Sequence, residues 1–326
     1  VNLLVAAGSS LFYFSSINFT PLGGRANVMK LSWMNSSEGV IYIRSAYSFL
    51  IASLTEALEH VFMVVLVYLL VCLSIYKLLF ATAIRRLPIK LVNSIKFPRF
   101  KRVLVVTSHP DDECMFFGPT ILSLTQQQGC QVYVLCLSNG NYEQKAKIRR
   151  VELWKACSTL GVPSANVTLI NASALQDDIN SEWKTELIAK LINKNVESLD
   201  IEAIVTFDRE GVSQHPNHCA IFYATASLCL SNLIPKGCKI YTLDSINVVR
   251  KYISIFDLIC TFVISTHWCI LNWREANIVR RAMNEHKSQM KWFRWLYIVF
   301  SRYMFINSLR EINLSDVELE MQIQDS

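Results

Sequence analysis

From residue 101 onward, short apolar runs rich in β-branched residues alternate with segments of helical periodicity, and this alternation strongly constrains the fold. Strands that are apolar on both faces and separated by helices of roughly 10–20 residues are typical of a parallel sheet built from βαβ units. The fold class is therefore α/β, a mostly parallel sheet with helices on both faces. The predicted strands are residues 103–107, 132–137, 167–170, 203–207 and 239–243, and the predicted helices are residues 113–127, 147–160, 182–195 and 217–229.

Composition excludes several classes of protein. The chain is 52% hydrophobic and 18% charged, with only 10 Gly and 8 Pro, so neither an intrinsically disordered chain nor a collagen-like fibre fits. The net charge of +6 is mild and gives no indication of a nucleic-acid partner. The ten cysteines form no CxxC pair and many lie in apolar runs. That pattern indicates reduced, buried thiols and a cytosolic location for most of the chain.

One apolar segment is long enough to cross a membrane. Residues 61–84 are apolar apart from Ser74 and Lys77. As a helix this segment reaches about 36 Å, which exceeds a hydrocarbon core of about 30 Å. The alternative is a buried core helix. We predict a single transmembrane helix here, with Lys77 extending its ammonium group toward the interface.

The basic residues around this segment predict its orientation. Residues 41–60 contain Arg44 as their only Lys or Arg, whereas the 20 residues after the span contain seven. Cytoplasmic flanks hold the excess of Lys and Arg, so the body after residue 85 is expected in the cytosol. The chain then divides into a lumenal segment of uncertain structure (1–60), the span (61–84), a basic juxtamembrane linker (85–101), a catalytic α/β domain (102–250) and an apolar, aromatic C-terminal region that associates with the membrane (251–326).

Two ionisable clusters follow two strands that we expect to be neighbours. The first predicted strand is followed by Ser108-His109-Pro110-Asp111-Asp112-Glu113, and the fourth leads to His215-Pro216-Asn217-His218. In a doubly wound sheet the first and fourth strands adjoin where the strand order reverses, and ligands bind outside their carboxyl ends. The sequence therefore places both clusters at one site.

Histidines and carboxylates of this kind suit a catalytic zinc site. Two histidines and one carboxylate form a common ligand set that leaves a position for water. Asp111 and Asp112 point in different directions, so one can face the metal and the other can act as a base. Each motif alone also suits a turn or a helix N-cap, which is the structural alternative. No GxGxxG follows the first strand and no P-loop motif is present, which disfavours a dinucleotide-binding oxidoreductase.

These motifs resemble those of a known family. The HPDDE segment at 109–113, Arg149 with Glu152, the segment 206–213 and the HPNH segment at 215–218 are similar to motifs of the LmbE-like de-N-acetylases. Within that family, the chain is most similar to the branch that acts on N-acetylglucosaminyl-phosphatidylinositol (GlcNAc-phosphatidylinositol), known as PIG-L, over roughly residues 100–310. The resemblance implies a Rossmann-like fold.

The resemblance also implies a reaction and residue roles. His109, Asp112 and His218 would bind a divalent metal, with Zn²⁺ expected; Asp111 would be the general base and His215, as imidazolium, would stabilise the oxyanion. The family reaction hydrolyses the N-acetyl group of GlcNAc-phosphatidylinositol, an early step of glycosylphosphatidylinositol (GPI) anchor synthesis at the endoplasmic reticulum membrane. The alternatives are a de-N-acetylase of a soluble N-acetylated sugar or thiol glycoside, and a non-catalytic membrane adaptor on the same fold.

Some features depart from the family or stay open. Gln214 stands where relatives usually have Gly, so a positive φ there would cost roughly 1 kcal/mol or more. Glu113 is expected to start a helix beside the site rather than to bind metal. Arg149 suits either the pocket or a solvated helix start. Whether His286 contacts the site is left undecided by the sequence. The apolar stretch 253–273 contains Asp257, which favours a membrane-surface element over a second span.

Overall fold

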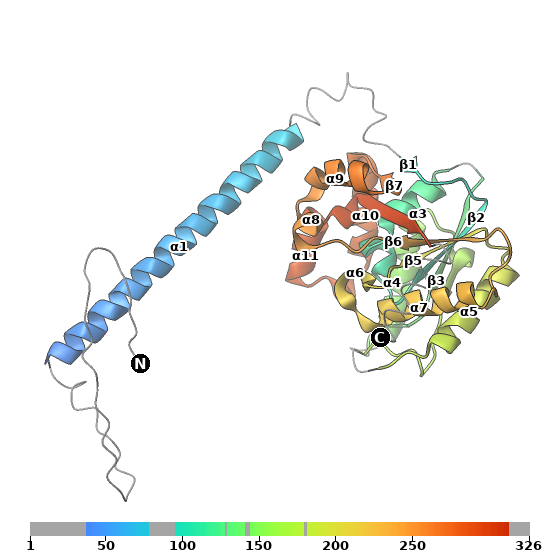
Figure 1. Ribbon diagram of the computed structural model, residues 1–326, viewed down its shortest axis with the longest axis horizontal. Helices are drawn as coiled ribbons and strands as arrows, with labels where there is room; N and C mark the ends of the chain where they lie inside the picture. Colours follow the sequence, from blue (N-terminus) through green and yellow to red (C-terminus); the bar gives the residue numbers. More distant parts are fainter. Residues whose placement is uncertain (1–36, 78–94, 128, 141–143, 179–180, 313–326) are drawn as a thin grey trace, which may run out of the picture. The chain divides into compact units, whose positions relative to one another are not determined.

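The computed structural model describes residues 37–77, 95–127, 129–140, 144–178 and 181–312 (Figure 1). The chain divides into two compact units, residues 1–84 and 85–326. The described part of the first unit is one helix, α1 (Ser37–Lys77), of 41 residues. The stretch Arg44–Tyr68 within α1 is long and apolar enough to cross a membrane, and no other helix among the described residues is.

The predicted span therefore overlaps α1 only in part. The helix begins at Ser37, well before residue 61, so residues 37–60 are helical rather than a separate segment. The candidate span lies nearer the start of the chain than the predicted one, and residues 78–84 of the prediction lie outside the described residues. The division between the two units does fall where the predicted span ends.

The second unit is built on a sheet of eight strands in the order β1-β7-β8-β6-β5-β2-β3-β4. Five of them are parallel neighbours. These are β2 (Arg102–Thr107), β3 (Gln131–Cys136), β4 (Val167–Leu169), β5 (Ala203–Phe207) and β6 (Lys239–Leu243). Their spatial order, β4-β3-β2-β5-β6, is that of a Rossmann-like sheet. The predicted fold class is confirmed, and β2 and β5 pair directly, with Val103 opposite Ala203.

Three further strands extend the sheet beyond β6, and each is antiparallel to its neighbour. They are β1 (Ile95–Lys96), β7 (His267–Ile270) and β8 (Ile306–Glu311). Because β7 and β8 belong to the same sheet as β2, residue 250 does not separate two units in the structure. The apolar stretch 253–273 forms a short helix, α9 (Asp257–Ile264), and then β7. At eight residues, α9 is about 12 Å long, far below a membrane's thickness.

Helices cover both faces of the sheet (Figure 1). Right-handed crossovers place α3 (Gly118–Thr125) and α4 (Ala146–Thr159) on one face, where α10 (Trp273–Glu285) packs against both. The opposite face carries α5 (Thr185–Ser198) and α7 (Pro216–Leu230), which pack together. The strand residues between these layers are buried and form a single core. The remaining helices are α2 (Asp112–Met115), α6 (Gly211–Gln214), α8 (Val248–Tyr252) and α11 (Trp292–Phe300), with 3₁₀ turns at Ser164–Asn166, Ser254–Phe256, Lys287–Gln289 and Arg302–Met304.

The helix predicted at 113–127 is broken into α2 and α3. Pro119 has no N–H to donate, so a new helix starts at Gly118 rather than continuing from α2. The backbone N–H of Thr120 donates to the Asn307 side chain on β8 at 3.1 Å, and its hydroxyl donates to the same oxygen at 2.8 Å. The break leaves α2 as a single turn that presents its first residues at the sheet edge.

The cysteines are free thiols, as the sequence predicted. The nine whose side chains the structure describes form no disulfide. Burial raises the pKa of Cys130 to about 11 and that of Cys269 to about 12. These thiols therefore stay protonated and unreactive near neutral pH.

Candidate metal centre and active site

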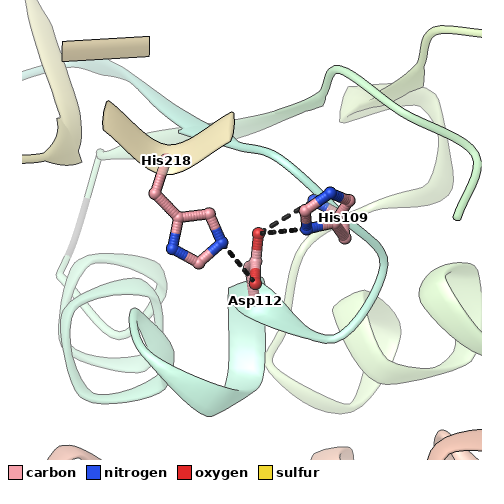
Figure 2. Close-up of side chains that lie close together, drawn as sticks. All are labelled: His109, Asp112 and His218. Carbon is pink, nitrogen blue, oxygen red and sulfur yellow. Dashed lines mark hydrogen bonds and ion pairs between the residues drawn. The ribbon is translucent and has the colours of Figure 1, made fainter. Parts of the chain in front are cut away.

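The carboxyl ends of β2 and β5 bring the two predicted clusters together. His109 and Asp112 follow β2, and His215 and His218 follow β5. One ligand atom from each of His109, Asp112 and His218 lies within 4.8 Å of the other two, and all three residues are buried. Figure 2 shows the Asp112 carboxylate between the two imidazole rings. The predicted convergence of two segments a hundred residues apart is present.

The loop that precedes Asp112 holds its carboxylate in place. Its Oδ2 accepts hydrogen bonds from the backbone N–H groups of Ser108, at 2.9 Å, and His109, at 2.8 Å. Its Oδ1 faces the His218 ring, with 3.5 Å to Nε2. The backbone therefore holds one carboxylate oxygen and leaves the other directed into the site.

His218 is oriented by the turn that precedes its helix. Its Nδ1–H donates to the Gly211 carbonyl oxygen at 2.9 Å, so Nε2 carries the lone pair and faces Asp112. The ring stacks on Phe207 at 4.0 Å with planes 6° apart. Gly211 has φ +55°, and a Cβ there would lie 2.7 Å from the His218 Cβ. A glycine is needed at this position for both conformation and space.

His109 is oriented by a carboxylate from a third loop. Its Nε2 lies 3.1 Å from Asp177 Oδ1 and 3.0 Å from the Asn217 side-chain amide. The Asp177 carboxylate can only accept a hydrogen bond and so favours a proton on Nε2, whereas the Asn217 Nδ2–H at 3.0 Å would favour a lone pair there; we assign the proton to Nε2 because the carboxylate carries the charge. Nδ1 then carries the lone pair, on the side of Asp112 Oδ2 at 3.9 Å. Carboxylate–histidine pairs of this kind are the usual second layer of a metal site.

The donor set fits a divalent cation. The separations of 3.5 Å and 3.9 Å between Asp112 oxygens and the two histidine nitrogens are too long for strong hydrogen bonds. Ligands at about 2.0–2.1 Å from a tetrahedral ion lie about 3.3 Å apart, close to these distances. Both imidazoles present a lone pair, and the donors are nitrogen and carboxylate oxygen, which zinc prefers.

The protonation states also suit metal binding. Burial lowers the pKa of His109 from 6.5 to about 4, so its ring is neutral at neutral pH. Burial favours the protonated form of Asp112, but the neighbouring His218 outweighs it and holds the Asp112 pKa well below its usual range. Burial likewise opposes charge on His218, and Asp112 outweighs it, so the His218 pKa is raised. Below the raised pKa of His218, metal binding therefore displaces the proton that this residue shares with Asp112.

Asp111 is held in a strained conformation between two arginines. Its φ is +123°, which residues other than glycine rarely adopt and which costs of order 1–3 kcal/mol. Its Oδ2 lies 2.7 Å from Arg294 Nη1 and its Oδ1 lies 3.7 Å from Arg149 Nη2. Arg149 is itself tied to the Pro110 carbonyl oxygen at 2.8 Å and to Asp177 at 2.8 Å. Of the two interpretations left open for Arg149, its burial in the site is the one found.

A buried ion pair supports the strained turn. Glu113 Oε2 accepts the backbone N–H of Asp111 at 2.9 Å, and Glu113 Oε1 lies 2.6 Å from His286 Nε2. Neither Glu113 nor His286 is exposed. Burial disfavours charge on His286, but Glu113 outweighs it and the His286 pKa is raised. Glu113 thus starts α2 beside the site, as expected, and His286 contacts it rather than the metal ligands.

His215 packs against the two histidines of the candidate ligand set. Its ring stacks on His218 with centroids 4.8 Å apart and lies 5.1 Å from the His109 ring. Its Nδ1 accepts the backbone N–H of Asn217 at 3.3 Å and caps α7. Burial and the neighbouring His218 lower its pKa. These surroundings favour a neutral ring with the proton on Nε2; the imidazolium role stays a prediction.

Two further groups of possible ligands occur among the described residues: His109, Asp177 and His215, and Glu113, Cys114 and His286. The first shares His109 with the main site. In the second, the Glu113–His286 ion pair occupies the donors, and burial raises the pKa of Cys114 far above its usual range. A thiol held protonated is a poor metal ligand.

Sequence reasoning missed two residues of the site. Asp177 follows β4, whose carboxyl end lies at the same sheet edge as the clusters, so topology offered a signal for it. Arg294 lies on α11, nearly two hundred residues beyond Asp111, in a segment interpreted only as aromatic and basic. No short sequence motif identifies Arg294 as a residue of the site.

The fold and the donor set define a class of protein. It is an α/β protein whose Rossmann-like sheet carries a buried centre of two histidines and one carboxylate at its topological switch point, the ligand set of hydrolytic zinc sites.

Comparisons with known proteins identify the family. Residues 104–229 match the family model PIG-L, described as GlcNAc-PI de-N-acetylase. The N-acetylglucosaminyl-phosphatidylinositol de-N-acetylase of Bos taurus is 44% identical over 209 residues, covering 64% of this chain and 82% of the bovine protein. A probable enzyme of the same name from Schizosaccharomyces pombe is 39% identical over 215 residues, covering 64% and 86%. Among solved structures, N,N'-diacetylchitobiose deacetylase from Pyrococcus horikoshii matches with a TM-score of 0.45 and 18% identity, covering 73% of this chain and 91% of that one. The chain belongs to the PIG-L family, and the resemblance seen in its motifs is confirmed.

Proposed function

We propose that this protein hydrolyses the N-acetyl group of GlcNAc-phosphatidylinositol, giving GlcN-phosphatidylinositol and acetate, an early step of GPI-anchor synthesis. The observation that carries this proposal is the preformed donor set of His109, Asp112 and His218 at the switch point of the sheet. The bovine relative, named for this activity, is 44% identical and matches over most of its own length.

The ligand residues are assigned from their orientation. His109, through Nδ1, Asp112, through its carboxylate, and His218, through Nε2, would hold Zn²⁺ or another divalent cation. Such a cation supplies Lewis acidity, which makes water a competent nucleophile near neutral pH and polarises a carbonyl group.

Proton transfer falls to Asp111, whose buried carboxylate neighbours Asp112 in sequence and lies between Arg294 and Arg149. Asp111 takes a proton from the attacking water while the water oxygen bonds to the amide carbon. It then returns that proton to the sugar nitrogen as the C–N bond breaks, which releases acetate and the free amine. Arg294 and Arg149 hold the carboxylate in place.

We assign to His215 the stabilisation of the negative charge that develops on the amide oxygen. With Nδ1 accepting the N–H of Asn217, its Nε2–H is the available donor, and a neutral imidazole can serve as well as an imidazolium. Removal of one such donor typically costs about 100- to 1000-fold in turnover.

The site of action follows from the lipid substrate and α1. We place the protein in the endoplasmic reticulum membrane as a single-pass protein with the catalytic unit in the cytosol. The candidate span in α1 and the excess of basic residues after it support this topology. The structure describes no protein partner, and none is assigned.

The decisive experiment uses microsomes that carry this chain in a deacetylase-deficient background. Release of acetate from GlcNAc-phosphatidylinositol supports the proposal, and turnover of free N-acetyl sugars alone would favour the soluble-sugar alternative. Asp111→Asn should retain the metal and lose about 100- to 10,000-fold in turnover, the range for a general base. His218→Ala should lose metal and activity together. A chain without metal and without turnover on either substrate would favour the adaptor alternative.

A further inference from the structure

Large apolar side chains are concentrated on one part of the catalytic unit. Among the described residues of that unit, eleven of the sixteen exposed large apolar side chains come from α8, α9 and α11. Val263 is 79% exposed and Trp292 is 76% exposed. We call this set the apolar surface; it consists of Val248, Val249, Tyr252, Ile259, Val263, Ile264, Trp292, Phe293, Trp295, Leu296 and Val299.

The three helices are joined to one another by specific contacts. Arg250 of α8 donates to Asp257 of α9 through Nε at 2.6 Å and Nη2 at 3.1 Å. Lys251 of α8 lies over the Tyr297 ring of α11, with 5.7 Å between its Nζ and the ring centroid. The helices also lie together along one side of the unit in Figure 1. The apolar surface is therefore one region on a fixed scaffold.

Helix α11 has one exposed apolar face and one face directed into the catalytic unit. Trp292, Trp295, Leu296 and Val299 follow the i, i+3, i+4, i+7 spacing of a single helix face, and all are exposed. The opposite face is directed inward. Arg294 reaches Asp111 at 2.7 Å and the Tyr297 hydroxyl donates to the Met115 carbonyl oxygen at 2.8 Å. One helix thus joins the apolar surface to the catalytic base.

We propose that the apolar surface docks onto the lipid bilayer and brings the active site to the membrane, where the headgroup sugar of the substrate lies. The proposal rests on the proposed function, because only a lipid substrate requires a site at the bilayer. A group of exposed large apolar side chains on adjoining helices is typical of an interaction surface, and tryptophan beside lysine is typical of the headgroup boundary. Lys287, in the 3₁₀ turn before α11, and Lys291, at the N-cap of α11, are exposed and suit anionic headgroups.

The chain itself favours a bilayer over a protein partner. The candidate span in α1 lies on the same polypeptide, so a membrane-inserted α1 holds the catalytic unit at high effective concentration beside lipid. An exposed apolar surface tethered in this way meets the bilayer before any soluble partner. In the docked orientation the exposed face of α11 contacts the lipid, and its opposite face, which carries Arg294, points toward Asp111.

The test places a fluorescent amino acid at chosen positions of the full chain in nanodiscs. A dansyl-bearing residue replaces Val263 or Trp295 in separate variants, which leaves the native cysteines untouched. The matched control replaces Leu233, an equally apolar and exposed residue that lies between α7 and β6. Brominated acyl chains quench a dansyl group only when it lies within the bilayer. Circular dichroism confirms that each variant is folded.

We expect brominated lipid to reduce emission about twofold or more at positions 263 and 295 and to leave position 233 unchanged. Equal emission with and without brominated lipid at positions 263 and 295 would overturn the proposal. The apolar surface would then be covered by a protein or by another segment of the chain, not by lipid. Quenching at 233 to the same extent would also overturn it. Quenching does not depend on turnover, so it can be measured even if no acetate is released. A failure of acetate release would therefore count against the proposed function alone.

Discussion

Replacement of Asp177 by Asn tests whether a carboxylate outside the ligand set controls the metal centre. Asp177 accepts from His109 Nε2 through Oδ1 at 3.1 Å and from Arg149 Nη1 through Oδ2 at 2.8 Å. Asparagine has the same shape and a single oxygen. In Asp177→Asn, one of the two donors must therefore face an NH₂ group, with little change in packing.

Two independent estimates of the effect agree. Loss of the partner that orients a metal-binding histidine typically lowers metal affinity about 10- to 100-fold. A buried donor left without an acceptor costs about 1–3 kcal/mol, and about 1.4 kcal/mol corresponds to tenfold. The His109 side chain is 7% exposed and its ring is neutral, so solvent offers little compensation. We expect zinc affinity in Asp177→Asn to fall about 10- to 100-fold.

The assay is a competition titration of the detergent-purified full chain against a fluorescent zinc chelator. The control is Asp200→Asn, which makes the same change at a side chain that is 86% exposed. Control and wild type should bind zinc equally. An affinity of Asp177→Asn within about twofold of wild type would refute the reasoning.

Three further predictions concern the surroundings of the ligands. Gly211→Ala should abolish stoichiometric zinc binding, measured by mass spectrometry, because its Cβ would meet His218 at 2.7 Å and its φ is +55°; retention of zinc would contradict the role of this turn. His286→Ala should lower the free energy of unfolding by about 3–5 kcal/mol in urea titrations, because it leaves Glu113 buried and unpaired; a loss below about 1 kcal/mol would exclude a buried ion pair. Zinc affinity should rise about tenfold per pH unit below the raised pKa of His218 and level off above it, because binding releases one proton from His218. His109, with a pKa of about 4, releases none near neutral pH. Chelator competition at several pH values measures this slope, and a slope that corresponds to two protons, or to none, would contradict the reasoning.

The parallel sheet was predictable because each βαβ unit is encoded locally. The predicted strands 203–207 and 239–243 match β5 and β6 residue for residue, since each is a short apolar run bounded by polar residues. Strand β7 was missed because its four residues continue an apolar stretch. They become a strand only by pairing with β8, about forty residues further on. That information is not local to either segment.

The site was predictable for a different reason. His109, Asp112 and His218 lie in short motifs whose residue types limit their chemistry, and the strand order alone brings those motifs together. The direction of Arg294 depends on how α11 packs, which its sequence leaves open because aromatic and basic residues also suit a membrane surface. The positive φ foreseen for Gln214 is present, at +57°.

Two residues with unfavourable backbone conformations lie next to the candidate ligands. Asp111, with φ +123°, precedes Asp112, and Val212, with φ +63°, lies in the turn before His218. Each costs of order 1–3 kcal/mol, and a β-branched residue such as Val212 is the less tolerant of the two.

Carboxylates that do not bind the metal hold both turns. Glu113 accepts the Asp111 N–H at 2.9 Å, and Asp208 accepts both the Gly211 N–H at 3.0 Å and the hydroxyl of Ser245 at 2.6 Å. Ser245 in turn accepts the Val212 N–H at 2.7 Å. Because none of these bonds uses a ligand atom of His109, Asp112 or His218, they can order the two turns as the chain folds, and the ordering cost then falls on folding rather than on metal affinity.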